Sequence, residues 1–230
     1  MANRKTERSE ERKSDRRNSI LQSAVKIFTQ KGYNQTTVKD ITEDAGVSIG
    51  TFYLYFKSKE DIFETLFDIV AQIHSNVYNE IIAQEGFNAV SRFCRITSAS
   101  LWAFERYREL SRIMLVEAVG LNPRIESKRI EIKNDSYLRM KDALHSLQGK
   151  KLIDIPDEKI GALVLEGASL NVCTFWLLNA IEEPLRSFSY AMNVFMLQAL
   201  GLSFEPNEVK ASIEGVLSEL DAVPDKYTPF

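Results

Sequence analysis

Cysteine and histidine are scarce in this chain of 230 residues, which contains two of each. Cys94 and Cys173 lie in apolar stretches with helical spacing, so we expect two buried thiols in a reducing compartment. His74 and His145 are single histidines on helical stretches, where surface or satisfied core groups are commoner than ligands. No His, Cys and carboxylate residues cluster with the spacing of metal ligands. We therefore expect neither a metal site nor a cofactor.

An apolar targeting segment is also missing from the sequence. The first residues, MANRKTERSEERKSDRR, are charged and contain no apolar core, so we expect no signal peptide. Ser187–Phe204 is free of formal charge but includes several polar residues, and a membrane span needs about 20 mostly apolar ones. We interpret it as a buried or interface helix, and we expect a cytoplasmic protein without membrane contact.

Catalytic motifs are nearly absent. The sequence contains no phosphate-binding P-loop and no dinucleotide-binding fingerprint. Residues 46–50, GVSIG, match the nucleophile-elbow pattern G-x-S-x-G, but such an elbow follows a strand in an α/β sheet. Here the match follows a helical apolar stripe, and a glycine turn with an N-cap serine explains it without chemistry. We therefore expect no catalytic residue and no enzyme.

Charge is distributed unevenly along the chain. Residues 1–60 carry 12 Lys and Arg against 8 Asp and Glu, whereas residues 61–230 carry 17 against 24. A basic N-terminal part on an acidic remainder indicates a nucleic-acid partner for the N-terminal part.

The basic part contains two short helical patterns around a glycine turn. A first helix is predicted from Asp15 or Arg16 to Lys31, with Gly32 as its C-terminal stop. Thr37 and Asp40 form a capping-box pattern at the start of the second helix. Gly46 supplies the following turn, and this spacing is that of a helix-turn-helix.

The third predicted helix starts after Ser48, a favourable N-cap residue. Phe52 and Phe56 are four residues apart and should anchor it in a small core. The residues on its other faces suit close approach to a nucleic-acid backbone and to base edges: Ile49, Gly50, Thr51, Tyr53 and Tyr55. Ser58 and Asp61 then start a long helix to about Gln84. Lys59 in its first turn opposes the helix dipole and needs a partner, for which a DNA phosphate is suitable.

The segment GVSIGTFYLYFKSKEDIF is similar to the recognition-helix signature of the TetR family of bacterial transcriptional repressors. The resemblance covers residues 16–63. It implies a three-helix head that binds operator DNA and a helical C-terminal domain that dimerises and binds a small ligand. The operator-contacting positions that it implies are Thr37, Lys39, Ser48, Ile49, Gly50, Thr51, Tyr53, Tyr55 and Lys59. Position 54 is often aromatic in the family, so Leu54 is left out of this set.

The remainder of the chain is predicted to be helical, without strand-like alternation or internal repeats. Helices are expected at about 87–105, 107–119, 124–147, 157–181, 186–200 and 206–220. The apolar helices 157–181 and 186–200 correspond in order to those that form the dimer interface in TetR relatives, where two from each chain make a four-helix bundle. Packing in the core of a single chain is the alternative.

A ligand cavity is a further expectation for this C-terminal part. Aromatic and soft residues are dense there, and we name as candidates Phe93, Trp102, Phe104, Met114, Tyr137, Asn171 and Phe175. A core of ordinary composition is the alternative. The head most resembles family members that respond to fatty acyl-CoA, which implies a hydrophobic effector.

The sequence thus predicts an all-α protein with four parts: a flexible polar arm at 1–15, a helix-turn-helix domain at 16–58, a ligand-binding and dimerisation domain at 59–221, and a frayed tail at 222–230. The predicted function is a dimeric, ligand-responsive regulator, and specifically a repressor, that binds palindromic DNA. The alternative is a helical small-molecule-binding protein whose helix-turn-helix no longer recognises specific DNA.

Overall fold

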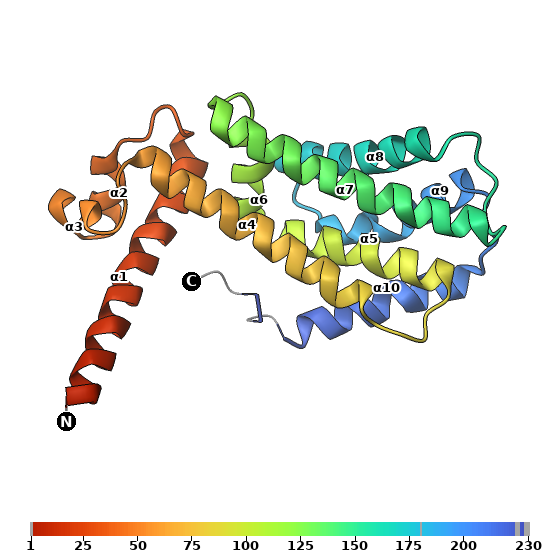
Figure 1. Ribbon diagram of the computed structural model, residues 1–230, viewed down its shortest axis with the longest axis horizontal. Coiled ribbons are helices and arrows are strands. Elements are labelled where there is room, and N and C mark those ends of the chain that lie inside the picture. The colour runs from red at the N-terminus through yellow and green to blue at the C-terminus, as the bar shows by residue number, and fades with distance from the viewer. Residues whose placement is uncertain (1, 180, 224–225, 228–230) are drawn as a thin grey trace.

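Helices make up most of the chain in the computed structural model, which describes residues 2–179, 181–223 and 226–227. A small head at one end contains α1 (Ala2–Lys31), α2 (Val38–Asp44) and α3 (Ile49–Tyr53). The long helix α4 (Lys59–Ile82) leaves this head and continues along the body (Figure 1). The predicted all-α architecture, with a helix-turn-helix head joined by a long helix to a helical body, is confirmed.

The body is a bundle in which α5 packs between α4 and α10. Its elements are α5 (Ala89–Arg106), α6 (Arg108–Arg112), the π-helical turn η1 (Ile113–Glu117), α7 (Pro123–Gly149), α8 (Glu158–Leu178), the 3₁₀ turn η2 (Leu185–Phe188), α9 (Ser189–Ala199) and α10 (Pro206–Asp221). One buried cluster runs from the head along α4 into α5 and α6. A second cluster fills the distal half of the body, among α5, α7, α8, α9 and α10.

The helix starts of the head follow from single side chains. Thr37 and Asp40 form the predicted capping box at α2, and the Ser48 hydroxyl accepts a hydrogen bond of 3.0 Å from the Thr51 N–H at α3. Gly32 and Gly46 adopt φ angles of +76° and +62°, in the left-handed region that glycine occupies without strain. The predicted stop after α1 and the turn between α2 and α3 are therefore confirmed.

The two ends of the chain differ from expectation. Helix α1 begins at Ala2 rather than at Asp15 or Arg16, so residues 2–15 are helical instead of a flexible arm. At the other end, Tyr227 is buried, and its hydroxyl donates a hydrogen bond to the Glu80 carboxylate on α4. Lys226 adds a 2.5 Å ion pair to the same carboxylate. This part of the tail is docked rather than frayed, because an aromatic ring with a satisfied hydroxyl gains from burial.

Candidate nucleic-acid interface

The core of the head fixes one face of α3 and leaves the other in solvent. Phe52 and Phe56 are buried with ring centroids 5.7 Å apart, and Ile41 of α2 is fully buried. Val38 and Val47 are half-buried and pack against the same cluster. Helix α3 is therefore held rigidly, as a helix that enters a DNA groove must be.

Most of the predicted contact residues are exposed, either at the start of α2 or on α3 and its N-cap. The exposed ones are Thr37, Lys39, Ser48, Ile49, Gly50 and Tyr53, while Thr51 is half-buried. Tyr55 is half-buried and packs against the core instead of facing outward. Six of the nine residues are thus exposed, and Thr51, Tyr55 and Lys59 are less accessible.

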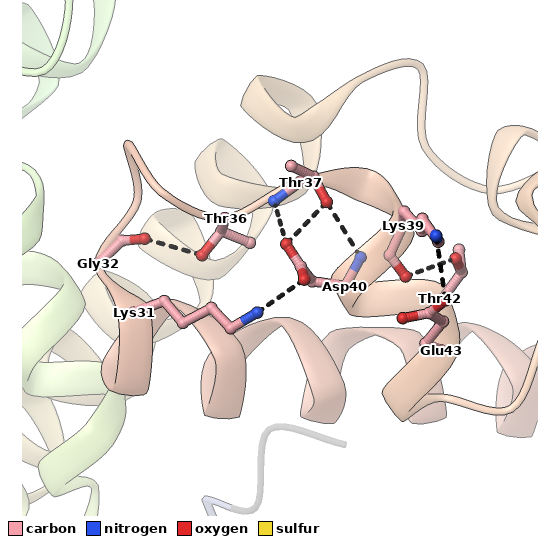
Figure 2. Close-up of polar contacts among 8 residues, drawn as sticks. All are labelled: Lys31, Gly32, Thr36, Thr37, Lys39, Asp40, Thr42 and Glu43. Carbon is pink, nitrogen blue, oxygen red and sulfur yellow. Dashed lines mark hydrogen bonds and ion pairs between the residues drawn. The ribbon is translucent and has the colours of Figure 1, made fainter.

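Helix α2 is locked at its start by a polar network (Figure 2). The Thr37 N–H and hydroxyl donate to Asp40 Oδ2 at 2.8 and 2.7 Å, and Lys31 Nζ donates to Asp40 Oδ1 at 2.7 Å. The hydrogen bond from Lys31, followed by those from Thr37, holds the pKa of Asp40 well below its usual range. Lys39 lies 3.6 Å from Glu43, an exposed pair of low stability. Its ammonium can therefore exchange this carboxylate for a phosphate.

The hydroxyl of Ser48 is fully used in capping. It accepts from the Thr51 N–H, and the two side-chain oxygens are 2.8 Å apart. The segment 46–50 connects α2 to α3, so the G-x-S-x-G match lies between two helices and not after a strand.

Lys59 has a partner within the chain. Its ammonium donates to the Tyr33 carbonyl oxygen at 2.8 Å and lies 4.1 Å from the centre of the Tyr33 ring. The Tyr33 hydroxyl donates to Glu60 at 2.8 Å, and burial followed by this hydrogen bond raises the Tyr33 pKa above its usual range. The cation at the start of α4 is therefore already satisfied without a nucleic acid.

Two exposed residues near α3 are missing from the set predicted from the sequence. Leu54, directly after α3, has 80% of its surface exposed. Lys57 is exposed, and its backbone N–H donates to the Asp61 carboxylate at 2.7 Å, which fixes the loop before α4. The sequence already indicated that Leu54 is exposed. Its position between Phe52 and Phe56 places it on a different face from these two buried phenylalanines.

A chain of polar contacts connects the head to the body. Glu117 in η1 accepts a hydrogen bond of 3.3 Å from the Tyr33 N–H, and its other oxygen lies 3.6 Å from Arg112 Nε. Arg112 also donates to the Leu177 carbonyl at the end of α8, at 3.2 Å. These contacts connect α8, α6 and η1 to the loop that follows α1, and sequence patterns did not indicate them.

The seven candidate ligand residues do not lie together. Trp102, Phe104 and Met114 are buried in the cluster nearer the head, whereas Phe93 and Tyr137 pack against the distal cluster. Asn171 and Phe175 lie on the exposed side of α8, because the buried side of that helix is occupied by Ala162, Leu165, Cys173, Trp176 and Leu177.

Near Phe104, α4 contributes a half-buried histidine whose ring nitrogen is shielded from solvent. The His74 ring centroid is 4.2 Å from that of Phe104, and its Nε2 has no hydrogen-bond partner within the described chain. Burial lowers the His74 pKa to about 4. Both cysteines are also buried, as predicted, and burial raises the pKa of each thiol to about 12.

Helices α8 and α9 expose a broad apolar surface. Val164 and Phe175 of α8 are 60% and 57% exposed, and Phe195 of α9 is 68% exposed. An apolar groove of about 400 Å³ lies where the start of α8 meets the end of α9, lined by Ile155, Pro156, Asp157, Ile160, Gly161, Val164, Leu165, Ala199 and Leu200.

Within the described residues, α8 is also the one helix long and apolar enough to span a membrane, although only 28% of that stretch is buried.

Comparison with known proteins places the helix-turn-helix in a family. Residues 20–66 match the profile of bacterial regulatory proteins of the tetR family. The fatty acid metabolism regulator protein of Bacillus subtilis is 27% identical over 173 residues, which are 74% of this chain and 88% of that protein.

Two solved structures share the fold over most of the chain. The fatty acid degradation regulator FadR of Bacillus halodurans has a TM-score of 0.69 and 19% identity, covering 82% of this chain and 97% of that one. The regulator FadR of Bacillus subtilis in complex with stearoyl-CoA has a TM-score of 0.64 and 23% identity, covering 77% and 96%.

Proposed function

We propose that this chain, a transcriptional regulator that belongs to the TetR family of bacterial regulatory proteins, binds palindromic operator DNA as a homodimer and represses transcription until a hydrophobic effector releases it. The observation that carries the proposal is the surface around α3. There a rigidly capped helix presents Ile49, Gly50 and Tyr53 to solvent in a basic head, with Thr51 half-buried beside them. Such a helix fits a major groove, with the apolar groups toward thymine methyls and the hydroxyls toward phosphates.

The homodimer is proposed to form through α8 and α9. Their exposed apolar residues form a surface larger than the isolated apolar side chains that are normal on a monomer, and a second copy covers it symmetrically. Glu166 and Asn171 interrupt the apolar composition of α8, which favours a protein partner over lipid and is consistent with a cytoplasmic protein.

The proposed effector is a fatty acyl-CoA. The support is the likeness to the Bacillus subtilis fatty acid metabolism regulator and to the structure that contains stearoyl-CoA. The apolar side chains between α4, α5 and α6, with the unpartnered Nε2 of His74 among them, are the proposed location. A coupling free energy of about 1–3 kcal/mol between the two sites is sufficient for release.

Two measurements test these assignments. The double variant Tyr53→Phe, Lys39→Gln should bind DNA more weakly and with a smaller salt slope than the original chain, because Lys39 is exposed and only loosely paired with Glu43. Unchanged values would refute the assigned contacts. Thermal unfolding in the presence of stearoyl-CoA should show a raised Tm, since a ligand that binds only the folded state stabilises it. The absence of any shift with C12 to C18 thioesters would remove acyl-CoA as the effector.

A further inference from the structure

The N-terminal half of α1 presents cations that the head does not use. Buried residues of this helix begin at Ile20, and upstream of it Arg12, Lys13 and Arg16 are all exposed. None of these three side chains has an ion pair or hydrogen bond within the described part of the chain. In contrast, Arg17 lies 5.3 Å from the centre of the Phe56 ring and belongs to the head.

The spacing of these cations carries an energetic cost. Arg12 and Arg16 are four residues apart on one face of α1, and the sequence continues the spacing with Arg4 and Arg8. Like charges at this spacing destabilise a helix, and a helical extension without packing partners is marginal in water. Arg12 and Arg16 therefore share one face of α1, and Glu11 and Asp15 occupy the neighbouring row. A polyanion along this face would remove the repulsion.

The direction of α1 indicates where that polyanion lies. In Figure 1, α1 leaves the head across the long axis of the molecule, and its N-terminal end lies on the same flank as α3, far from the body. The helix also points away from α7 and α8. If two copies pair through α8 and α9, the arms extend outward from the centre of the pair.

We propose that the exposed residues 10–16 of α1 are a second DNA-binding element, which follows the phosphate backbone on the outer side of each half-site through Arg12, Lys13 and Arg16. The proposal rests on the proposed function as an operator-binding dimer. At 1.5 Å per residue this segment is about 10 Å long, which corresponds to roughly three base pairs. The contacts add affinity without base recognition, since phosphates carry no sequence information.

The test uses the palindrome that the full-length protein enriches from random duplex DNA. Fluorescence anisotropy compares a duplex that ends at the outer edges of the palindrome with one extended by ten base pairs on each side. The original chain should bind the extended duplex at least about tenfold more tightly, with a salt slope steeper by up to about 5 for six phosphates per dimer. The variant Arg12→Gln, Lys13→Gln, Arg16→Gln should bind both duplexes equally and still recognise the palindrome.

A matched control distinguishes the effect of the cations on α1 from the effect of the net charge of the protein. Lys133, Lys150 and Lys151 are exposed on the body, and their replacement by Gln removes the same charge away from the head. This control should retain the preference for the extended duplex. Equal binding of both duplexes by the original chain, or an unchanged preference in the arm variant, would overturn the proposal. Failure to enrich any palindrome would instead refute the proposed function.

Discussion

At the residue scale, the capping side chains of the head were predictable and the partners of its cations were not. Thr37, Ser48 and Ser58 act within three residues along the chain, so a sequence pattern contains the whole interaction. Lys59 finds its partner 26 residues away, at the Tyr33 carbonyl. A contact of this range depends on how α1 and α4 pack, which local spacing does not encode.

The first prediction distinguishes the role of Lys57, which precedes α4, from that of Lys59, which lies in the first turn of α4. Lys57→Gln should weaken DNA binding several-fold and reduce the salt slope by roughly 1 per protomer without changing Tm, because its exposed ammonium has only phosphate to contact. Lys59→Gln should lower the free energy of unfolding by about 1–2 kcal/mol, because it loses a charged hydrogen bond and a cation–π contact. Anisotropy titrations over a salt series and thermal unfolding check both. An unchanged salt slope for Lys57→Gln would contradict the assignment.

The second prediction concerns His74 and acid. Burial lowers its folded-state pKa to about 4 from 6.5, so the unfolded chain binds the proton more readily between these values. The contribution of the neutral His74 imidazole to the free energy of unfolding is therefore fully present above about pH 6.5. It is lost as the pH falls toward 4, by roughly 1.4 kcal/mol per pH unit at most.

Urea unfolding of the original chain and of His74→Leu at pH 7 and pH 5 measures this difference. The stability of the original chain relative to the variant should fall by about 1–2 kcal/mol between the two pH values. His145→Leu is the matched control, since that histidine is exposed and paired with Glu158 at 3.0 Å. Equal acid sensitivity of the original chain and His74→Leu would show that His74 does not stay neutral.

At the element scale, the helices were predictable where caps and apolar spacing agree. The expected helix at 107–119 is divided into α6 and the π-helical turn η1, and no cap marks that division. Glu117 at the end of the turn contacts Tyr33, and Arg112 at the end of α6 contacts the end of α8. A π-helical turn is often found at a functional position, and here it lies between the proposed effector region and the head.

The third prediction tests this junction as the route of coupling. Glu117→Gln keeps the size of the side chain but removes the charge that faces Arg112. Operator affinity without effector should change little, whereas the loss of affinity caused by stearoyl-CoA should shrink several-fold, since mutations on a coupling route alter it by about 0.5–2 kcal/mol. The exposed Glu131→Gln on α7 serves as control. A full effector response in Glu117→Gln would exclude this route.

At the scale of the whole molecule, the division into a head and a body was predictable from charge and spacing, whereas the arrangement of the body was not. The candidate ligand residues fall into two clusters and onto an exposed face, because aromatic density in the sequence does not indicate which side of a helix is buried. Leu163, Val164 and Phe175 lie on the exposed side of α8, and the proposed dimer would cover them.

The fourth prediction addresses this surface. Phe195→Asp should convert a dimer into monomers at micromolar concentration, because pairing would bury an unpaired carboxylate at a cost of about 3 kcal/mol or more. This cost corresponds to a rise of more than 100-fold in the dimer dissociation constant. Ile130→Asp on α7 is the matched control, since Ile130 is 60% exposed and lies on neither α8 nor α9. Sedimentation velocity distinguishes the two, and a dimeric Phe195→Asp would place the interface elsewhere.

A gel-shift selection of the protein on random duplex DNA, followed by sequencing of the bound fraction, tests whether the helix-turn-helix recognises a specific sequence. An operator-binding dimer should enrich a palindrome whose half-sites lie about one helical turn, roughly 34 Å, or a near multiple apart. Sequence-blind binding that depends only on salt would contradict it and would favour a helical small-molecule-binding protein whose helix-turn-helix no longer recognises specific DNA.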